Sequence, residues 1–214
     1  IFRTKTIRKL FVLGMAVALP NLIAAQTTTG TLRVGIVQGG DIGDQVPDYA
    51  RPAAVLRNQI SQTLAHQKSL QLADVVLWPE NSVNLLSTND ANSEQIQAVV
   101  NSINKPFLIG AVIDSVTAGP RNVGILWMPA SGPTQTYVKK HLVPFGEYIP
   151  FRTVLEPRIG RLSQIPEDFV AGGDGGVMTV HDQELGVAIC FEVADQEHLN
   201  YLVRNGSKAF IGLS

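Results

Sequence analysis

The chain has 214 residues, of which 45% are hydrophobic and 16% charged, and its formal net charge is -1. This length suits one core domain with an appendage, and a near-neutral charge gives no electrostatic argument for nucleic-acid binding. The single cysteine excludes an internal disulfide, and the 4 histidines are scattered rather than spaced as metal ligands. The sequence therefore predicts no metal and no cofactor.

Residues 1–29 combine a basic start with an apolar stretch. Four cations lie among the first nine positions, an apolar run follows over 10–25, and small residues precede Gln26. This pattern is typical of a signal peptide, or of a transmembrane helix whose basic flank stays in the cytoplasm. A buried helix of a soluble protein is a third interpretation, which leaves the unbalanced cations unexplained. Because the first residue is Ile1 rather than methionine, we interpret the chain as processed or as a piece of a longer one.

Residues 30–214 show the pattern of an α/β domain. Apolar, β-branched runs alternate with helical periodicity early in the chain, and strands follow one another later. The predicted strands are Leu32–Val37, Asp74–Trp78, Phe107–Ile113, Asn122–Pro129, Thr134–Val138, Gly176–Val180, Glu184–Cys190 and Ala209–Leu213. The predicted helices are Ala53–Leu72 and Asn92–Ile103, the second with its N-cap at Asn92 or Ser93. We expect a sheet covered by helices on one face, and a lid or binding loop in the aperiodic segment 150–175.

Three stretches place a reactive side chain at the end of a predicted strand. Cys190 ends a short apolar run, Glu80 follows Trp-Pro, and Lys139 and Lys140 follow Tyr-Val. Taken alone, each has a simple structural explanation: a buried thiol, a solvated loop carboxylate and a solvated basic turn. Ligands of open α/β sheets bind at strand ends, so the three together indicate a site with Cys190 as its nucleophile.

The order Glu, Lys, Cys resembles that of the carbon-nitrogen hydrolase, or nitrilase, superfamily. The segments Lys-Lys-His-Leu-Val-Pro-Phe-Gly-Glu and Ile-Cys-Phe-Glu are more specific, and they resemble the nitrilase-like domain of bacterial apolipoprotein N-acyltransferases over residues 32–214. The resemblance implies an αββα sandwich, which would be incomplete at its C-terminal end because Ser214 follows a strand directly. It also favours the transmembrane interpretation. Residues 1–29 would then form one membrane-spanning helix with a basic cytoplasmic flank and a short linker, and residues 30–214 the catalytic domain on the periplasmic side of the bacterial inner membrane.

The resemblance also implies roles for individual residues. The catalytic triad would be Glu80 as general base, Lys139 as the ammonium that stabilises the developing oxyanion, and Cys190 as nucleophile. Lys139 is preferred to its neighbour because the family's lysine stands two residues before His-Leu. Glu147 and Glu192 are expected to support the triad by keeping the lysine charged and oriented.

The implied reaction is the transfer of an acyl chain from a phospholipid to the N-terminal amine of a diacylglyceryl-cysteine of an apolipoprotein, through a thioester on Cys190. Its partners are the membrane, the phospholipid donor and the diacylated apolipoprotein, with no nucleic acid. Two alternatives stay open: a nitrilase-superfamily amidase that hydrolyses a small amide, and a non-catalytic, membrane-anchored binding module. The apolar N-terminal segment argues against the first, and the presence of all three triad residues argues against the second.

Overall fold

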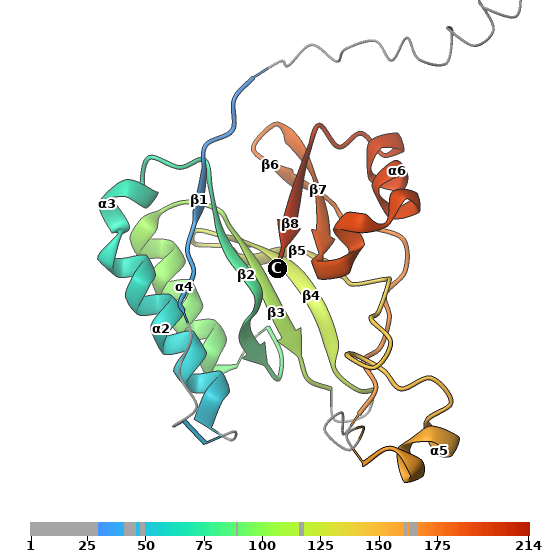
Figure 1. Cartoon of the computed structure of the whole chain (residues 1–214). Coiled ribbons are helices and arrows are strands. Elements are labelled where there is room, and N and C mark those ends of the chain that lie inside the picture. The colour runs from blue at the N-terminus through green and yellow to red at the C-terminus, as the bar shows by residue number, and fades with distance from the viewer. Residues whose placement is uncertain are drawn as a thin grey trace, which may run out of the picture. The chain divides into compact units, whose positions relative to one another are not determined.

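A computed structural model of the chain describes residues 30–40, 46–47, 50–88, 90–115, 118–160, 162 and 167–214 (Figure 1). One compact unit begins at Leu32 and continues to Ser214. The predicted membrane-spanning segment, residues 1–29, lies outside the described residues. Within the described residues, no helix combines the length and the apolar character that crossing a membrane requires.

The strands of this unit form two sheets, one with the order β1-β2-β3-β4-β5 and one with the order β6-β7-β8. The strands are β1 Val34–Ile36, β2 Val75–Leu85, β3 Phe107–Ile113, β4 Arg121–Met128, β5 Gly132–Val138, β6 Val177–Val180, β7 Gln183–Ile189 and β8 Ala209–Leu213. In the first sheet β1, β2 and β3 run parallel, while β4 and β5 are added antiparallel. In the second, β7 pairs antiparallel with β6 and parallel with β8.

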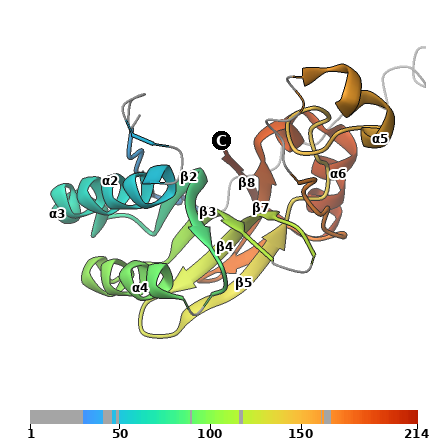
Figure 2. The same ribbon diagram turned by 90° about the horizontal axis from the view of Figure 1, so that it is seen from below.

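Helices cover the outer faces of both sheets. The helices of the described residues are α2 Arg51–Ala65, α3 Gln67–Leu70, α4 Ala91–Ile103, α5 Arg152–Leu155 and α6 Gln196–Arg204, with 3-10 turns η3 Glu156–Arg158 and η5 Cys190–Ala194. Helix α5 buries no residue and lies apart from both sheets (Figure 1). Figures 1 and 2 show α2 and α4 on the side of the five-stranded sheet and α6 on the side of the three-stranded one. The order of layers is therefore helix, sheet, sheet, helix, which agrees with the predicted αββα architecture.

Two apolar cores hold these layers together. The first lies between the helices and the five-stranded sheet and includes Trp78, Ile96 and Phe107. The second lies between the two sheets, where Leu108 of β3 and Val187 of β7 are both fully buried. Burial of this kind stabilises a fold by about 1.5–3 kcal/mol for each large apolar side chain. The second core matters for function, because it fixes the first part of β2 and the end of β5 relative to the end of β7.

Several sequence predictions need correction. The strand predicted to end at Trp78 continues to Leu85, and the long predicted helix is divided into α2 and α3. The N-cap of α4 is Asp90, whose carboxylate accepts a hydrogen bond from the backbone N–H of Ser93, rather than either residue that the sequence suggested. Helix α6 was not predicted at all. The aperiodic segment 150–175 contains α5 and the turn η3.

Candidate active site

Glu80 lies in β2 where the strand leaves its regular pairing with β3. The parallel register shifts between Trp78 and Val83, and Asn81 within this irregular stretch has a φ of 57°. Gly110 of β3 makes room for the displaced backbone, since a Cβ atom there would lie 2.7 Å from the Cα of Glu80. Bulges of this kind re-aim side chains. The irregularity turns the carboxylate of Glu80 toward the end of β5.

Lys139 follows β5 and is buried, with an exposed fraction of only 1%. Its ammonium lies 2.9 Å from Oε1 of Glu147 and 3.4 Å from Oε1 of Glu80. Burial acts to lower the pKa of Lys139, but the hydrogen bond and charge of Glu147, together with the charges of Glu80 and Cys190, raise it above its usual value. The lysine is therefore a fixed ammonium at neutral pH.

Glu147 is held by its own loop as well as by the lysine. Its Oε2 accepts a hydrogen bond from the backbone N–H of Val143 at 2.8 Å, across a turn in which Phe145 has a φ of 62°. Its Oε1 faces the ammonium of Lys139. One carboxylate thus joins the loop after β5 to the buried lysine, which fixes the position of the ammonium.

Asn122 of β4 belongs to the same cluster, although the sequence analysis did not single it out. It is buried, and its Nδ2 lies 2.6 Å from Oε1 of Glu80 and 2.8 Å from Oε1 of Glu147. Its backbone carbonyl accepts the N–H of Lys139 at 2.8 Å. The only signal in the sequence is a polar residue at the start of an otherwise apolar strand.

Cys190 stands directly after β7, on the first residue of the turn η5. It is half-buried and packs against the core between the sheets. Its φ is 52°, in the left-handed region that residues other than glycine seldom adopt. Such backbone strain is concentrated at functional sites. The turn places the thiol at the strand end rather than within the core.

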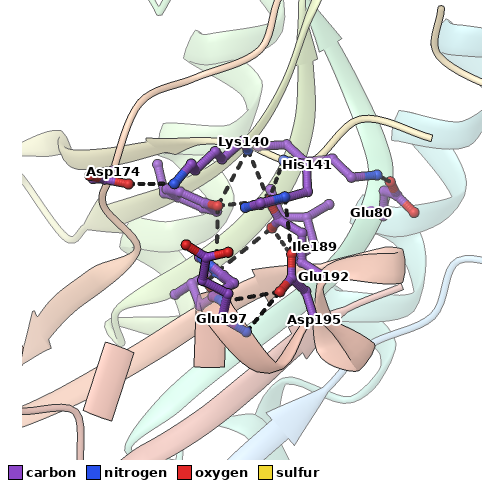
Figure 3. Close-up of polar contacts among 12 residues, drawn as sticks. Glu80, Lys140, His141, Asp174, Ile189, Glu192, Asp195 and Glu197 are labelled. Carbon is purple, nitrogen blue, oxygen red and sulfur yellow. Dashed lines mark hydrogen bonds and ion pairs between the residues drawn. The ribbon is translucent and has the colours of Figure 1, made fainter. Parts of the chain in front are cut away.

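The carboxylate of Glu192 links the turn that carries Cys190 to the segment that carries Lys139. Its Oε2 accepts the backbone N–H of Ile189 at 2.9 Å, and its Oε1 accepts that of Lys140 at 2.8 Å (Figure 3). One of these donors immediately precedes the cysteine, and the other immediately follows the lysine. A single buried carboxylate therefore joins the backbone beside Cys190 to the backbone beside Lys139.

Further donors complete the environment of Glu192, which is fully buried. The N–H of His141 and the hydroxyl of Tyr137 both donate to Oε1, at 3.0 and 2.8 Å. Burial and the negative charge of Glu192 raise the pKa of Tyr137, so that its hydroxyl remains a donor. In the described part of the chain, Glu192 contacts the backbone beside Lys139 rather than its ammonium, which is a different form of support from the one expected.

Lys140 is directed away from this cluster. Its ammonium pairs with Asp174 at 2.6 Å (Figure 3), and the two side chains are 36% and 62% exposed. Asp174 raises the pKa of Lys140 through a hydrogen bond, and Lys140 lowers that of Asp174 in the same way. The structure thus brings Glu80, Lys139 and Glu147 into direct contact, and leaves Lys140 at the surface.

A groove of about 640 Å³ begins beside the residue that follows Cys190. Its walls are mainly apolar, and its lining residues are Lys140, His141, Leu142, Pro144, Tyr148, Asp168, Phe169, Ala171, Phe191 and Asp195. Phe191 is 64% exposed. Among the polar residues, Nδ1 of His141 lies 3.0 Å from Oδ2 of Asp195. An open, mainly apolar groove beside the residue after Cys190 suits a substrate with a hydrocarbon portion.

Comparison with known proteins gives a consistent family likeness, although no family model matches the chain. An apolipoprotein N-acyltransferase of Mycolicibacterium smegmatis is 29% identical over 219 residues, which cover 91% of this chain and 36% of that protein. One from Pasteurella multocida is 27% identical over 150 residues, which cover 66% of this chain and 29% of that protein. The chain therefore spans about a third of the length of these curated relatives.

Solved structures share the fold. A carbon-nitrogen hydrolase from Helicobacter pylori G27 superposes with a TM-score of 0.62 at 13% identity, over 86% of this chain and 59% of that one. An amidase from Nesterenkonia sp. AN1, in which acrylamide has added to the active-site cysteine, gives a TM-score of 0.60 at 13% identity, over 86% and 66%. The resemblance to apolipoprotein N-acyltransferases in sequence and to carbon-nitrogen hydrolases in fold is therefore confirmed.

Proposed function

We propose that this chain, with its likeness to apolipoprotein N-acyltransferases, carries the catalytic domain of an enzyme that acylates lipoproteins. The acyl chain comes from a phospholipid and is transferred to the N-terminal amine of a diacylglyceryl-cysteine through a thioester on Cys190. The observation that carries the proposal is one connected set of contacts. Glu80 and Glu147 contact the ammonium of Lys139, and Glu192 ties the backbone beside that lysine to the backbone beside the cysteine.

In the first step, Cys190 attacks the carbonyl carbon of a phospholipid ester. Glu80 accepts the proton of the thiol, so that sulfur attacks as a thiolate. The carbonyl oxygen becomes negative, and the ammonium of Lys139 stabilises it; a single well-placed donor contributes about 3 kcal/mol to such a step. The bond from carbon to the ester oxygen then breaks. The proton passes from Glu80 to the leaving lysophospholipid, and the acyl chain remains on sulfur as a thioester.

In the second step, the α-amine of the diacylated apolipoprotein attacks the thioester carbon. Lys139 again faces the oxygen that becomes negative, and Glu80 takes a proton from the attacking nitrogen. The bond from carbon to sulfur breaks, and the thiol of Cys190 recovers its proton. The products are an N-acylated lipoprotein and the free enzyme, so each catalytic group returns to its starting state.

The surroundings proposed for this chemistry are apolar. The groove beside Phe191 offers a place for the acyl chain, and water that would hydrolyse the thioester is excluded when that chain fills it. The exposed apolar side chains of Phe151, Val154 and Ile159 lie on and beside α5. With residues 1–29 as a membrane anchor, the domain would act at the periplasmic surface of the inner membrane, where both substrates reside.

Mass spectrometry of the intact, full-length protein after incubation with phospholipid tests this proposal. We expect a mass increase of one acyl group, located on Cys190 by peptide mapping, and none on the Cys190→Ala variant. An adduct as abundant on that variant would overturn the assignment. Adding a diacylated lipopeptide should discharge the thioester with formation of an N-acylated lipopeptide.

The same preparation separates acyl transfer from amide hydrolysis, the activity of the structurally similar Nesterenkonia amidase. An amidase would release ammonia from small amides and would discharge its thioester to water whether or not an amine is present. Discharge that depends on the lipopeptide amine supports the transferase. A protein that forms no adduct with either substrate class would support a binding module without catalysis.

A further inference from the structure

We infer that Asn122 is a positioning residue that holds the carboxylates of Glu80 and Glu147 side by side on the single ammonium of Lys139. The inference rests on the proposed function in that it takes Glu80 as the base that serves Cys190. The neutral side chain of Asn122 would keep Glu80 in place for proton transfer, while Glu147 anchors Lys139.

The geometry is a closed ring of two donors and two acceptors. Nζ of Lys139 lies 3.4 Å from Oε1 of Glu80 and 2.9 Å from Oε1 of Glu147. Nδ2 of Asn122 lies 2.6 and 2.8 Å from the same two oxygens. Each carboxylate oxygen thus lies between the ammonium and the amide. On average, the contacts that Asn122 makes with these two oxygens are shorter than those of Lys139. The amide therefore defines how closely the two carboxylates approach each other.

The charges explain why such a donor is needed. Two carboxylates, with side chains only 14% and 12% exposed, share one cation, so their mutual repulsion is not fully balanced. Like charges in one site favour proton uptake, whereas a hydrogen bond to the charged form opposes it. A second cation in place of Asn122 would also balance the charge, but it would hold the proton-accepting oxygen of Glu80 more tightly. A neutral amide positions the carboxylate without adding a second charge to the site.

The orientation of the amide supports this role. Only its nitrogen can donate to carboxylates, so the two contacts fix Nδ2 toward Glu80 and Glu147. This leaves Oδ1 of Asn122 buried without a hydrogen-bond partner among the described residues. Buried polar atoms are normally paired. The side chain therefore adopts the orientation that serves the two carboxylates at the expense of its own oxygen.

The backbone of Asn122 contributes to the same alignment. Its carbonyl accepts the N–H of Lys139 at 2.8 Å, beside the pairing of Val123 with Val138 that joins β4 to β5. Asn122 thus contacts Lys139 through its main chain, and it contacts Glu80 and Glu147 through its side chain. Replacing the side chain leaves the main-chain contact in place, so its effect can be measured separately.

The test measures how the alkylation of Cys190 depends on pH. Full-length protein is treated with iodoacetamide between pH 5 and pH 9, and the rate is followed by intact mass, so the readout needs no phospholipid. For Asn122→Ala we expect the rise of the alkylation rate on the acidic side of the profile to move to higher pH by about one unit. The reason is that Glu80 and Glu147 each lose a hydrogen bond from the amide. On that side of the profile, the rate at a given pH should fall about tenfold, since one unit corresponds to tenfold in ionisation.

Gln59→Ala is the matched control. Gln59 is also a buried carboxamide, but its Nε2 donates to the carbonyl of Val37 and not to either carboxylate of the cluster. We expect it to lower the melting temperature and to leave the alkylation profile unchanged. A profile for Asn122→Ala that coincides with that of the unmodified protein would overturn the inference. If this variant shows no cooperative unfolding transition, Asn122→Ser, which keeps one donor, should show a smaller shift in the same direction, and no shift would again overturn it.

The outcome is independent of whether phospholipid is the substrate. A shifted alkylation profile in a protein that never forms an acyl adduct would support the role of Asn122 and contradict the proposed function. An unchanged alkylation profile in a protein that forms the acyl adduct on Cys190 would contradict the role of Asn122 and support the proposed function.

Discussion

The backbone of Gly110 lies directly against that of Glu80, so closely that a Cβ atom on the glycine would be 2.7 Å from the Cα of the glutamate. Substitution by alanine must therefore displace the irregular part of β2. We expect Gly110→Ala to slow acylation of Cys190 about 100-fold, the effect of misplacing a catalytic group by an ångström. Single-turnover acylation followed by intact mass measures the rate.

Gly124→Ala serves as its control, because Gly124 pairs directly with Gly110 across β3 and β4. A Cβ there would lie 3.1 Å from a methyl of Leu213 and 3.3 Å from a methyl of Val187, both in the core between the sheets, and it would not touch the backbone of Glu80. We expect a loss of stability and a much smaller loss of acylation rate than for Gly110→Ala. Equal rates for both variants would show that the contact with Glu80 is not what positions the base.

The two adjacent lysines should differ sharply. Lys139→Ala leaves the carboxylates of Glu80 and Glu147 without their cation, which should cost about 3 kcal/mol of unfolding free energy and about 100-fold in acylation rate. Lys140→Ala removes only an exposed contact with Asp174, so both quantities should stay near those of the unmodified protein. Chemical denaturation and the acylation assay give the two readouts. Similar losses for both variants would mean that the wrong lysine has been assigned to the oxyanion.

The raised pKa of Lys139 predicts a loss of stability at high pH. Above the unfolded value of 10.5, the unfolded chain releases this proton while the folded protein keeps it, so unfolding becomes easier as pH rises. The stabilisation from this lysine should be constant below pH 10.5 and disappear as pH passes through the raised folded pKa. Unfolding free energies of the unmodified protein and Lys139→Met, measured from pH 8 to pH 12, should converge over this window. A constant difference would contradict it.

The carboxylate of Glu192 should matter more than any one of its donors. Glu192→Gln turns an amide N–H toward backbone donors that need an acceptor, which should cost about 2–3 kcal/mol and slow acylation. Tyr137→Phe removes one donor and leaves the carboxylate in contact with Ile189 and Lys140, for a cost of about 1 kcal/mol. Thermal unfolding with acylation kinetics distinguishes them. A larger effect from the tyrosine would show that its hydroxyl, not the carboxylate bridge, organises the site.

Much of the fold was predictable from local pattern. Phe107–Ile113 and Ala209–Leu213 were predicted with the bounds that the structure shows, because each is an uninterrupted apolar run bounded by polar or breaking residues. Helix α6 was missed because it buries little more than His198 and Leu202, although Asp195 provides a recognisable N-cap. The continuation of β2 beyond Trp78 depends on room supplied by another strand, which no local pattern reports.

The candidate site divides in the same way. Cys190, Glu80 and the two lysines could be singled out because each carries chemistry at the end of a strand that the sequence predicts, although in the structure Glu80 lies within β2. Choosing Lys139 required the family resemblance, since burial separates it from its neighbour only in three dimensions. Asn122 could not be found from sequence at all, because its importance lies in contacts with residues 42 and 25 positions away.

The acid and the ammonium belong to the five-stranded sheet, and the sulfur to the three-stranded one. A state in which the three-stranded sheet has separated from the five-stranded sheet would keep its secondary structure and still lack catalytic activity. Thiol reactivity consequently reports the docking between the layers, including losses that far-UV circular dichroism would not register.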